Sequence, residues 1–363
     1  MNHFDEIRRQ LEAHGLDAVL LTGQSNRFYA SGFFTPGSDA VALATRKTAY
    51  FFTDARYTEA AAAALGGGVQ LRELTAENRL TAQLQAIFAE EGAARLGFED
   101  AELSVQEYRR YRKSFGDFKP PCELAAASGW LLELRQAKDE AEIAQMQAAQ
   151  DIAERALEDI LREIRPGVAE REIAARLQYL MLHYGASDMS FDPIAAPGPS
   201  GSRPHAVPSG REIQPGDFVT MDFGCIYGGY CSDMTRTVAV GHATEEMRRV
   251  YSTVLAAQEA GIAAAKAGVT GKAVDAAARD VITSAGYGEY FIHSFGHGVG
   301  VDIHEAPNCS PLNDKPLPAG AVVSAEPGIY IPGRLGVRIE DVLVLTQGGN
   351  RNLTHAPKEL LVL

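Results

Sequence analysis

Two segments of this 363-residue chain resemble each other at an offset of 101 residues, and this repeat restricts the fold more than any other feature. They are GVAEREIAARLQYLMLHYG at 167–185 and GVTGKAVDAAARDVITSAG at 268–286. Both begin with Gly-Val, carry an apolar residue six positions later (Ile173 and Val274) and end in glycine. A solenoid needs at least three short units. We therefore interpret the pair as two halves of one α+β domain with a site between them; the alternative is a chance likeness of two amphipathic helices.

The first ~120 residues alternate between helical and strand patterns, which is typical of an α/β sheet domain. Phe4, Ile7 and Leu11 share one helical face, and residues 16–22 form a short apolar strand pattern. Residues 119–122, Lys-Pro-Pro-Cys, interrupt regular structure. We predict an α/β domain at 1–125, followed by an α+β domain at 130–363.

Charge and hydropathy exclude several classes of partner. The chain has 34 Lys and Arg against 47 Asp and Glu, a net charge of −13, which disfavours nucleic acid and anionic membranes. No uncharged apolar run reaches the ~18 residues that a membrane span needs. Met1 to Gln10 alternates charges and lacks the apolar stretch of a secretory signal. We therefore expect a cytoplasmic protein.

The four cysteines, Cys122, Cys225, Cys231 and Cys309, are too few for a disulfide framework in a chain of this length. Cys225 and Cys231 could be read as half of a zinc site, but their spacing is not CxxC and no second pair completes four ligands. Reduced structural thiols are the simpler interpretation.

Residues 217–240 read as a β-hairpin whose turn lies at Tyr227-Gly228-Gly229. A turn centred between Tyr227 and Gly228 would place Asp222 directly opposite Asp233, with Cβ atoms ~4.5–5.5 Å apart. Two facing carboxylates destabilise a hairpin by up to ~1 kcal/mol, and burial adds to the cost. A cation between them would remove it. The alternative is a pair of solvated aspartates near a turn.

Further ionisable residues follow downstream. Three histidines, His293, His297 and His304, lie in FIHSFGHGVGVDIHE. Glu326 ends an apolar strand pattern, and Arg338 and Glu340 are two residues apart, so they share one strand face.

A Glu on a core strand needs a partner. Asp222, Asp233, Glu326 and Glu340 with one histidine carry too much negative charge for one divalent cation. The set suits two cations ~3.5–4 Å apart. Its oxygen-rich chemistry favours Mn²⁺ or Co²⁺ over a Cys/His zinc site.

These motifs together resemble the pita-bread metallopeptidases, which include Xaa-Pro aminopeptidases, Xaa-Pro dipeptidases (prolidases), methionine aminopeptidases and creatinases. The resemblance rests on Asp222 and Asp233 eleven residues apart, Gly-His297-Gly, His304-Glu305, Glu326-Pro-Gly and Arg338-Ile-Glu340-Asp. SNRFYASGF at 25–33 and TDARY at 53–57 resemble the creatinase-type N-terminal domain. The resemblance implies a pseudo-twofold catalytic domain.

The resemblance also implies roles for individual residues. The metal ligands would be Asp222, Asp233, His297, Glu326 and Glu340, with Asp233 and Glu340 bridging two divalent ions, Mn²⁺ first and Co²⁺ or Zn²⁺ as alternatives. His205 in RPHAVP, His304 and His293 match family histidines. The Pro-rich stretch 192–204 departs from the family pattern, so we expect it to shape the pocket differently.

In the expected mechanism, Glu326 takes a proton from the attacking water and passes it to the leaving nitrogen. His205 or His304 donates a hydrogen bond to the developing oxyanion. Arg338 orients the acidic ligands; a surface ion pair is the alternative interpretation.

We expect a cytoplasmic Xaa-Pro aminopeptidase that acts on peptides with proline in the second position. The close alternative is an Xaa-Pro dipeptidase. Methionine aminopeptidase would not need the N-terminal domain, and creatinase lacks the metal ligands present here. An inactive peptide-binding module should have lost ligands. The resemblance further implies a homodimer or a dimer of dimers.

Overall fold

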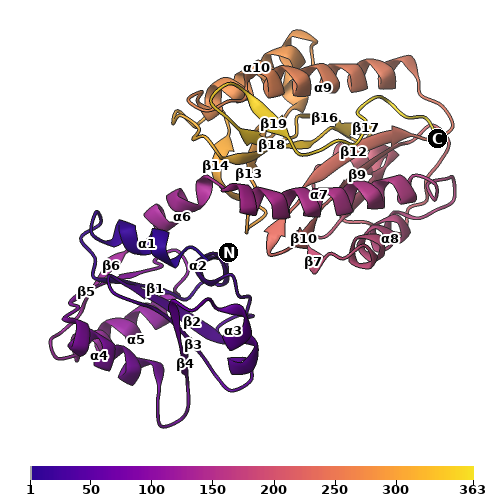
Figure 1. The fold of residues 1–363 in the computed structure, drawn as a ribbon. Coiled ribbons are helices and arrows are strands. Elements are labelled where there is room, and N and C mark those ends of the chain that lie inside the picture. Colours follow the sequence, from indigo (N-terminus) through magenta and orange to yellow (C-terminus); the bar gives the residue numbers. More distant parts are fainter. Residues whose placement is uncertain (1) are drawn as a thin grey trace. The chain divides into compact units, whose positions relative to one another are not determined.

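The computed structural model describes residues 2–363. The chain divides into two compact units, the first ending at Arg135 and the second spanning Gln136–Leu363. Figure 1 shows the elements of each unit along the chain. Among the residues that the structure describes, no helix combines the length and the apolar character that crossing a membrane requires.

The first unit is a mixed six-stranded sheet with the strand order β4-β3-β2-β1-β5-β6. β1 pairs in parallel with β5 and antiparallel with β2, so the predicted α/β character is confirmed. Its strands are β1 (Ala18–Leu21), β2 (Ala40–Thr45), β3 (Ala49–Thr53), β4 (Val69–Glu73), β5 (Arg95–Phe98) and β6 (Glu123–Ala126). Its helices are α1 (Phe4–Leu11), α2 (Gln24–Ser31), α3 (Thr58–Ala64), α4 (Leu80–Glu91), α5 (Val105–Gly116) and α6 (Ser128–Gln136).

The core of this unit lies on both faces of the sheet. Phe4, Ile7 and Leu11 of α1 are buried in one cluster, as their helical spacing predicts. Leu84 and Phe88 of α4 belong to a second cluster, together with strand side chains that are not part of the first cluster. The alternating sequence pattern therefore places helices on two faces of the sheet, which is the arrangement expected of an α/β layer.

The second unit consists of two similar halves. The first half contains α7 (Glu140–Ile160), α8 (Glu170–His183), β7 (Asp188–Met189), β8 (Ile194–Pro197), the short helix η1 (Gly198–Ser202), β9 (Phe218–Phe223), β10 (Cys225–Tyr227), β11 (Tyr230–Cys231) and β12 (Met234–Ala239). The second contains α9 (Glu245–Ala264), α10 (Gly271–Ser284), η2 (Gly288–Tyr290), β13 (Gly296–Gly298), β14 (Glu305–Cys309), β15 (Val322–Ala325), β16 (Gly328–Ile331), β17 (Leu335–Arg338), β18 (Asp341–Leu345) and β19 (Asn350–Asn352).

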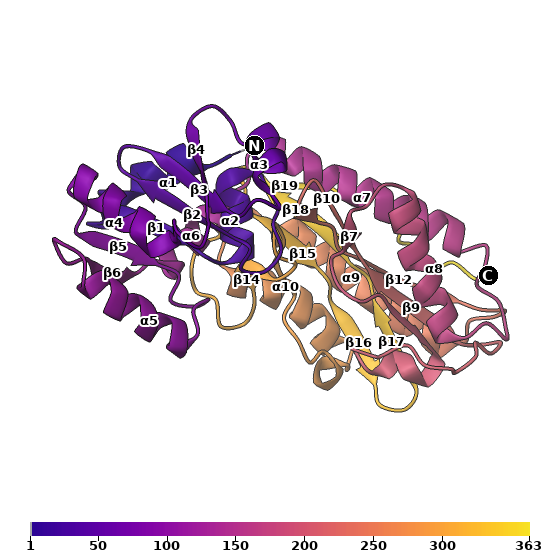
Figure 2. The same ribbon diagram turned by 90° about the horizontal axis from the view of Figure 1, so that it is seen from below.

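Each half covers its own sheet with its own helix pair (Figure 2). The first half has the strand order β12-β9-β8, and the second β14-β13-β15-β18-β19. Ile152 and Leu177 of the first helix pair share a core with Val219 of β9. Val254 of α9 and Leu343 of β18 belong to the equivalent core of the second half.

The sequence repeat corresponds to a structural repeat. The two similar segments contain α8 and α10, each 14 residues long, and each follows a helix of 20 or 21 residues. Gly167 and Gly268 precede these helices with φ of 88° and 84°, and Gly185 and Gly286 follow them with φ of 107° and 85°. These backbone angles favour glycine. The alternative of a chance likeness is therefore wrong.

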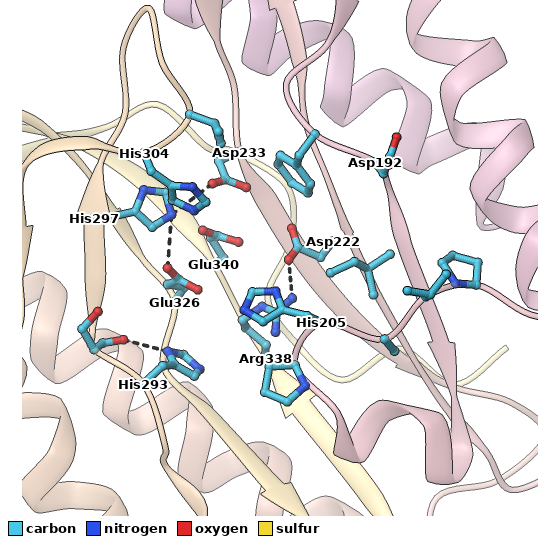
Figure 3. Close-up of a pocket in the computed structure, with 18 residues that line it drawn as sticks. Asp192, His205, Asp222, Asp233, His293, His297, His304, Glu326, Arg338 and Glu340 are labelled. Atoms are coloured by element: carbon cyan, nitrogen blue, oxygen red, sulfur yellow. Dashed lines mark hydrogen bonds and ion pairs between the residues drawn. The ribbon is translucent and has the colours of Figure 1, made fainter. Parts of the chain in front are cut away.

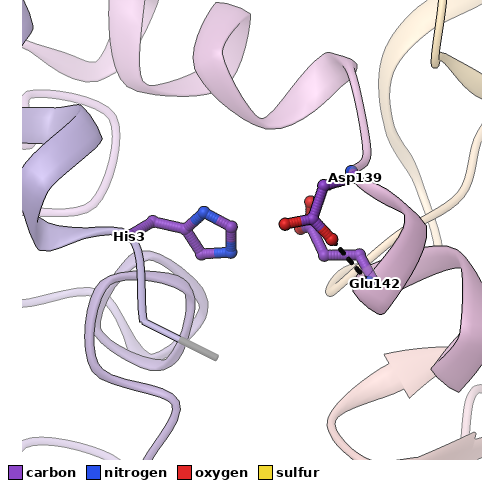
Figure 4. Close-up of side chains that lie close together, drawn as sticks. All are labelled: His3, Asp139 and Glu142. Carbon is purple, nitrogen blue, oxygen red and sulfur yellow. Dashed lines mark hydrogen bonds between the residues drawn. The ribbon is translucent and has the colours of Figure 1, made fainter. Parts of the chain in front are cut away.

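A capping box fixes the start of α7. Asp139 caps the helix by accepting from the backbone N–H groups of Ala141 and Glu142, both at 2.8 Å. The Glu142 carboxylate accepts in return from the Asp139 N–H at 2.8 Å, which completes a capping box (Figure 4). The helix ends at Ile160, before the Pro166-Gly167 dipeptide is reached.

The predicted register of the hairpin is wrong, because its turn is centred one residue later than expected. β9 and β12 pair antiparallel with Asp222 opposite Thr235, not opposite Asp233. The turn residues are Gly228 and Gly229, whose φ values of 56° and 84° are both positive. A two-residue hairpin loop of this kind favours glycine at both central positions, so the turn is centred one residue later than predicted and every pair shifts by two.

Candidate metal centre

One cavity in the second unit, of about 520 Å³, receives all nine predicted site residues (Figure 3). Asp222 and Asp233 come from the first half, on β9 and just before β12. His297 on β13, Glu326 after β15 and Glu340 after β17 come from the second half. The cavity is also lined by His205, His293, His304 and Arg338. The two halves therefore supply one common site.

His297 lies between two of the carboxylates. Its Nε2 atom is 3.5 Å from Asp233 Oδ2 and 3.3 Å from Glu326 Oε1. Its Nδ1 atom is 3.1 Å from the backbone oxygen of Gly298, so in the neutral ring Nδ1–H donates there and the Nε2 lone pair faces the carboxylates. Single ligand atoms from Asp233, His297 and Glu340 lie within 4.8 Å of one another. This is the orientation that a metal-binding imidazole requires.

The carboxylates lack the partners that buried charges need. Asp222 Oδ1 and Asp233 Oδ1 are buried and have no hydrogen-bond partner among the described residues. Burial, with the Asp222 and Glu326 carboxylates, raises the pKa of Asp233 well above its usual range. Burial, with Asp233 as the nearest charge, raises the pKa of Glu340 in the same way. Four crowded carboxylates, two of which have an unpartnered oxygen, fit divalent cations, whose charge offsets the repulsion.

Arg338 is part of the site and not a surface ion pair. Its guanidinium is buried and donates to the Asp222 carboxylate, to Tyr330 Oη at 2.8 Å and to Thr235 Oγ1 at 3.0 Å. Burial would lower the pKa of Arg338, but Tyr330, Asp222 and the two nearby glutamates raise it further above its ordinary value. The arginine therefore stays charged and fixes the Asp222 side chain.

Sequence reasoning missed two hydroxyl residues that hold the ligands. Thr235 Oγ1 donates to Glu340 Oε2 at 2.7 Å. Tyr330 Oη accepts from Arg338 and is 2.9 Å from His293 Nε2. Burial raises the pKa of Tyr330 to about 12, so its hydroxyl keeps its proton. The available signal for Thr235 was its position opposite Asp222, which the wrong hairpin register concealed.

Three histidines surround the ligands. His304 packs edge-on against His297, with ring centroids 4.3 Å apart, and burial together with His297 lowers the pKa of His304. Burial also lowers the pKa of His293, whose Nδ1 lies 2.8 Å from the Ser294 carbonyl oxygen. His205 is exposed at the cavity rim beside Val207.

Not all of the cavity lining is polar. Phe191, Ile194 and Val207 add apolar surface, and Asp192 adds a further carboxylate. These residues belong to the Pro-rich stretch and its flanks, where loop contacts could not be predicted. The cavity thus combines a polar floor with a partly apolar wall, as small-molecule sites commonly do.

All four cysteines are buried and free. None of them lines the cavity. Cys225 and Cys231 lie in neighbouring hairpin strands, where Cys225 Sγ donates to the Ala149 carbonyl oxygen at 3.4 Å. The structure therefore agrees with structural thiols.

Known proteins with the same architecture share both units. The model of metallopeptidase family M24 matches residues 144–347, and the creatinase/prolidase N-terminal domain matches residues 4–137. An Xaa-Pro dipeptidase of Lactobacillus delbrueckii subsp. lactis is 36% identical over 99% of both chains.

Two solved structures extend this likeness. An Xaa-Pro dipeptidase from Bacillus anthracis is 41% identical, with a TM-score of 0.93 over 99% of both chains. An X-Pro aminopeptidase from Thermotoga maritima MSB8 is 36% identical, with a TM-score of 0.91 over 100% of both chains. With its two matched domains and its cluster of acidic and histidine side chains, this chain belongs to metallopeptidase family M24.

Proposed function

We propose that this protein is a metal-dependent exopeptidase that hydrolyses the bond between a first residue and proline. The observation that carries the proposal is the cluster of four carboxylates near His297, two buried and two part-buried, with two unpartnered oxygens, inside a cavity of a family M24 fold. Such a cluster is costly without cations, so it is best explained as a metal centre.

Two classes of substrate are candidates, namely Xaa-Pro dipeptides and longer Xaa-Pro-Yaa peptides. Relatives and solved structures named Xaa-Pro dipeptidase favour dipeptides, whereas the sequence favoured the aminopeptidase. The Thermotoga maritima structure, named X-Pro aminopeptidase, supports the longer substrate as the second candidate. We take the dipeptidase as the first candidate.

We propose that Asp222, Asp233, His297, Glu326 and Glu340 would hold two divalent cations, with Mn²⁺ as the first candidate. When bound, such cations lower the pKa of a coordinated water towards neutrality and polarise a carbonyl. The unpartnered oxygens of Asp222 and Asp233 are the atoms with free coordination capacity.

Glu326 is placed to move protons during the reaction. One of its oxygens accepts from Ser324 Oγ at 3.2 Å, which fixes the carboxylate. Burial raises the pKa of Glu326, so the group can take a proton from water and give it to the leaving proline nitrogen. The leaving nitrogen needs this proton because it departs as an amine and not as an amide anion.

The remaining residues bind and orient the substrate. His304 and His205 line the cavity and supply N–H donors for the charge that develops on the carbonyl oxygen. Arg338 keeps Asp222 in place by a direct ion pair, while Thr235 and Tyr330 accept hydrogen bonds from the same guanidinium and fix its position. The apolar wall of Phe191, Ile194 and Val207 offers a surface to a proline ring.

The decisive assay incubates the protein with Xaa-Pro and Xaa-Pro-Yaa peptides in the presence of Mn²⁺, Co²⁺ or Zn²⁺. Faster release from the dipeptide supports the dipeptidase, and faster release from the tripeptide supports the aminopeptidase. Glu326→Gln serves as the inactive control. Metal-loaded protein that leaves both peptides intact would reject the proposed function.

We also propose that the enzyme works in the cytoplasm as a homodimer or a dimer of dimers. The chain mass is 39.0 kDa. Light scattering should therefore report at least twice this mass at working concentration, and a fully active monomer would reject the assembly.

A further inference from the structure

A buried ion pair joins the beginning of the second unit to the histidine region of the metal centre. Lys138 Nζ lies 2.5 Å from Glu305 Oε1, and the two side chains are 1% and 3% exposed. Glu305 directly follows His304, whereas Lys138 directly precedes the cap residue of α7. Lys138 does not line the cavity, and its side chain contacts the histidine region through Glu305.

The chain around Glu305 is packed against glycines. Gly298 pairs with Glu305 between β13 and β14, and a Cβ atom at Gly298 would lie 2.5 Å from the Glu305 backbone oxygen. A Cβ atom at Gly300 would lie 2.2 Å from Glu305 Oε1. Because they lack side chains, Gly298 and Gly300 of the GHGVG motif leave room for Glu305. We call residues 299–304 the histidine loop.

The histidine loop also contacts the other half of the site. The backbone oxygen of Gly300 accepts from the N–H of Cys231 at 2.8 Å, and Cys231 precedes Asp233 by two residues. The second oxygen of Glu305 accepts from the N–H of Asp302 at 3.4 Å. The Glu305 carboxylate thus contacts the histidine loop, which follows His297, ends at His304 and contacts the segment of Asp233.

A buried ion pair is an inefficient way to stabilise a fold. Replacing such a pair with apolar side chains is often neutral or stabilising, whereas removal of one partner leaves an uncompensated charge. The Glu305 carboxylate instead connects Lys138 to the backbone of the histidine loop at Asp302. Ligand-supporting groups of this kind typically change metal affinity or activity 10–100-fold when they are removed.

We propose that Lys138 is a positioning residue of the metal centre: through Glu305 it holds the histidine loop, and with it His297 and His304, in the geometry that binds metal. The effect on metal affinity rests on the proposed ligand set and on the geometry around Glu305. Its consequence for catalysis rests on the proposed function.

The test compares Lys138→Met with Arg211→Met. Arg211 forms an ion pair with Asp217 at 3.0 Å in the same unit but does not line the cavity. Three quantities are measured: the Mn²⁺ dissociation constant by calorimetry, amide hydrogen exchange of residues 299–305 in metal-free protein, and kcat and KM separately.

Lys138→Met is expected to weaken Mn²⁺ binding about 10–100-fold, to speed exchange in the histidine loop and to lower kcat more than it raises KM. Arg211→Met is expected to change stability but not metal affinity. A folded Lys138→Met protein whose affinity and loop exchange stay within twofold of the wild type overturns the inference, as does an equal loss in Arg211→Met.

A second variant covers the case in which Lys138→Met does not fold. Glu305→Gln keeps the side-chain volume and removes the charge, and it is expected to weaken Mn²⁺ binding in the same direction. Unchanged affinity and exchange in this variant overturn the inference. If the wild type binds Mn²⁺ but cleaves no Xaa-Pro peptide, the proposed function fails while the metal-affinity comparison still decides the role of Lys138.

Discussion

The Arg236 side chain contacts the segment that contains Glu340 and Asp341. Its replacement gives a quantitative test of the structure. Its guanidinium is buried on β12, and all five of its N–H groups donate to described acceptors. These acceptors are the Asp341 carboxylate (2.9 Å) and the backbone oxygens of Thr235 (2.9 Å), Glu340 (2.6 Å), Ala356 (2.7 Å) and Pro357 (2.9 Å).

The cost of Arg236→Met can be worked out from these contacts. Removing one partner of a buried ion pair costs about 3–5 kcal/mol, and the low end applies because Lys358 still contacts Asp341 at 2.9 Å. Loss of the donor for four backbone oxygens adds about 0.5 kcal/mol each. The variant should therefore lose about 5 kcal/mol of unfolding free energy. For a unit of this size, that corresponds to a melting temperature ~10–20 °C lower.

The deficit should depend on pH with a defined sign. Burial would raise the pKa of Asp341, but Arg236 and Lys358 hold it below its ordinary value. A carboxyl with a depressed folded pKa stabilises the fold above its unfolded pKa of ~3.9 and loses this contribution as the pH falls through the folded pKa. The difference between wild type and Arg236→Met is thus expected to shrink in acid.

Scanning calorimetry at neutral pH measures the effect. Arg351→Met is the control, because Arg351 and Glu140 form an exposed pair at 3.2 Å that should contribute less than ~1 kcal/mol. An Arg236→Met protein within 1 kcal/mol of the wild type would refute the reasoning.

Three further predictions concern the metal centre and the thiols. Asp233→Asn should lower the bound metal, measured by elemental analysis, and cut activity at least ~100-fold, since it removes a proposed ligand; unchanged metal content would contradict this. The pKa values of Asp233 and Glu340 are raised, chiefly by burial, so the metal-free protein binds more protons when it is folded than when it is unfolded. Its melting temperature should therefore fall as the pH rises above ~4, and added Mn²⁺ should remove this dependence. A melting temperature that does not change with pH in the presence of a chelator would argue against crowded carboxylates. Burial raises the pKa of the Cys122 and Cys309 thiols to about 12 and that of Cys225 to about 11, so native protein should react with a thiol reagent far more slowly than unfolded protein; rapid native labelling would contradict the buried positions.

The periodic features of the sequence predicted most of the architecture. The repeat predicted two similar halves because glycines at fixed positions bound equivalent helices, such as Gly167 and Gly268. The helical spacing of Phe4, Ile7 and Leu11 predicted a buried face in the same way. All nine candidate site residues line one cavity. They could be predicted because ionisable side chains inside apolar strand patterns are uncommon unless they have a partner or a function.

Cross-strand contacts could not be predicted. The hairpin register depended on which two residues form the turn, and Tyr227-Gly228-Gly229 permits more than one centre. That error hid Thr235, and Tyr330 reads as an ordinary core tyrosine in a strand. The bond between Lys138 and Glu305 joins residues far apart in the chain, and no local pattern reports such a contact.

The split origin of the five proposed ligands has a consequence for biosynthesis. A ribosome delivers Asp222 and Asp233 long before Glu326 and Glu340, so a nascent chain carries the acidic pair without the groups that complete the cage. On the proposed ligand set, the site is complete only after the second half has been translated, and a chain that ends before Glu326 lacks two of the five ligands.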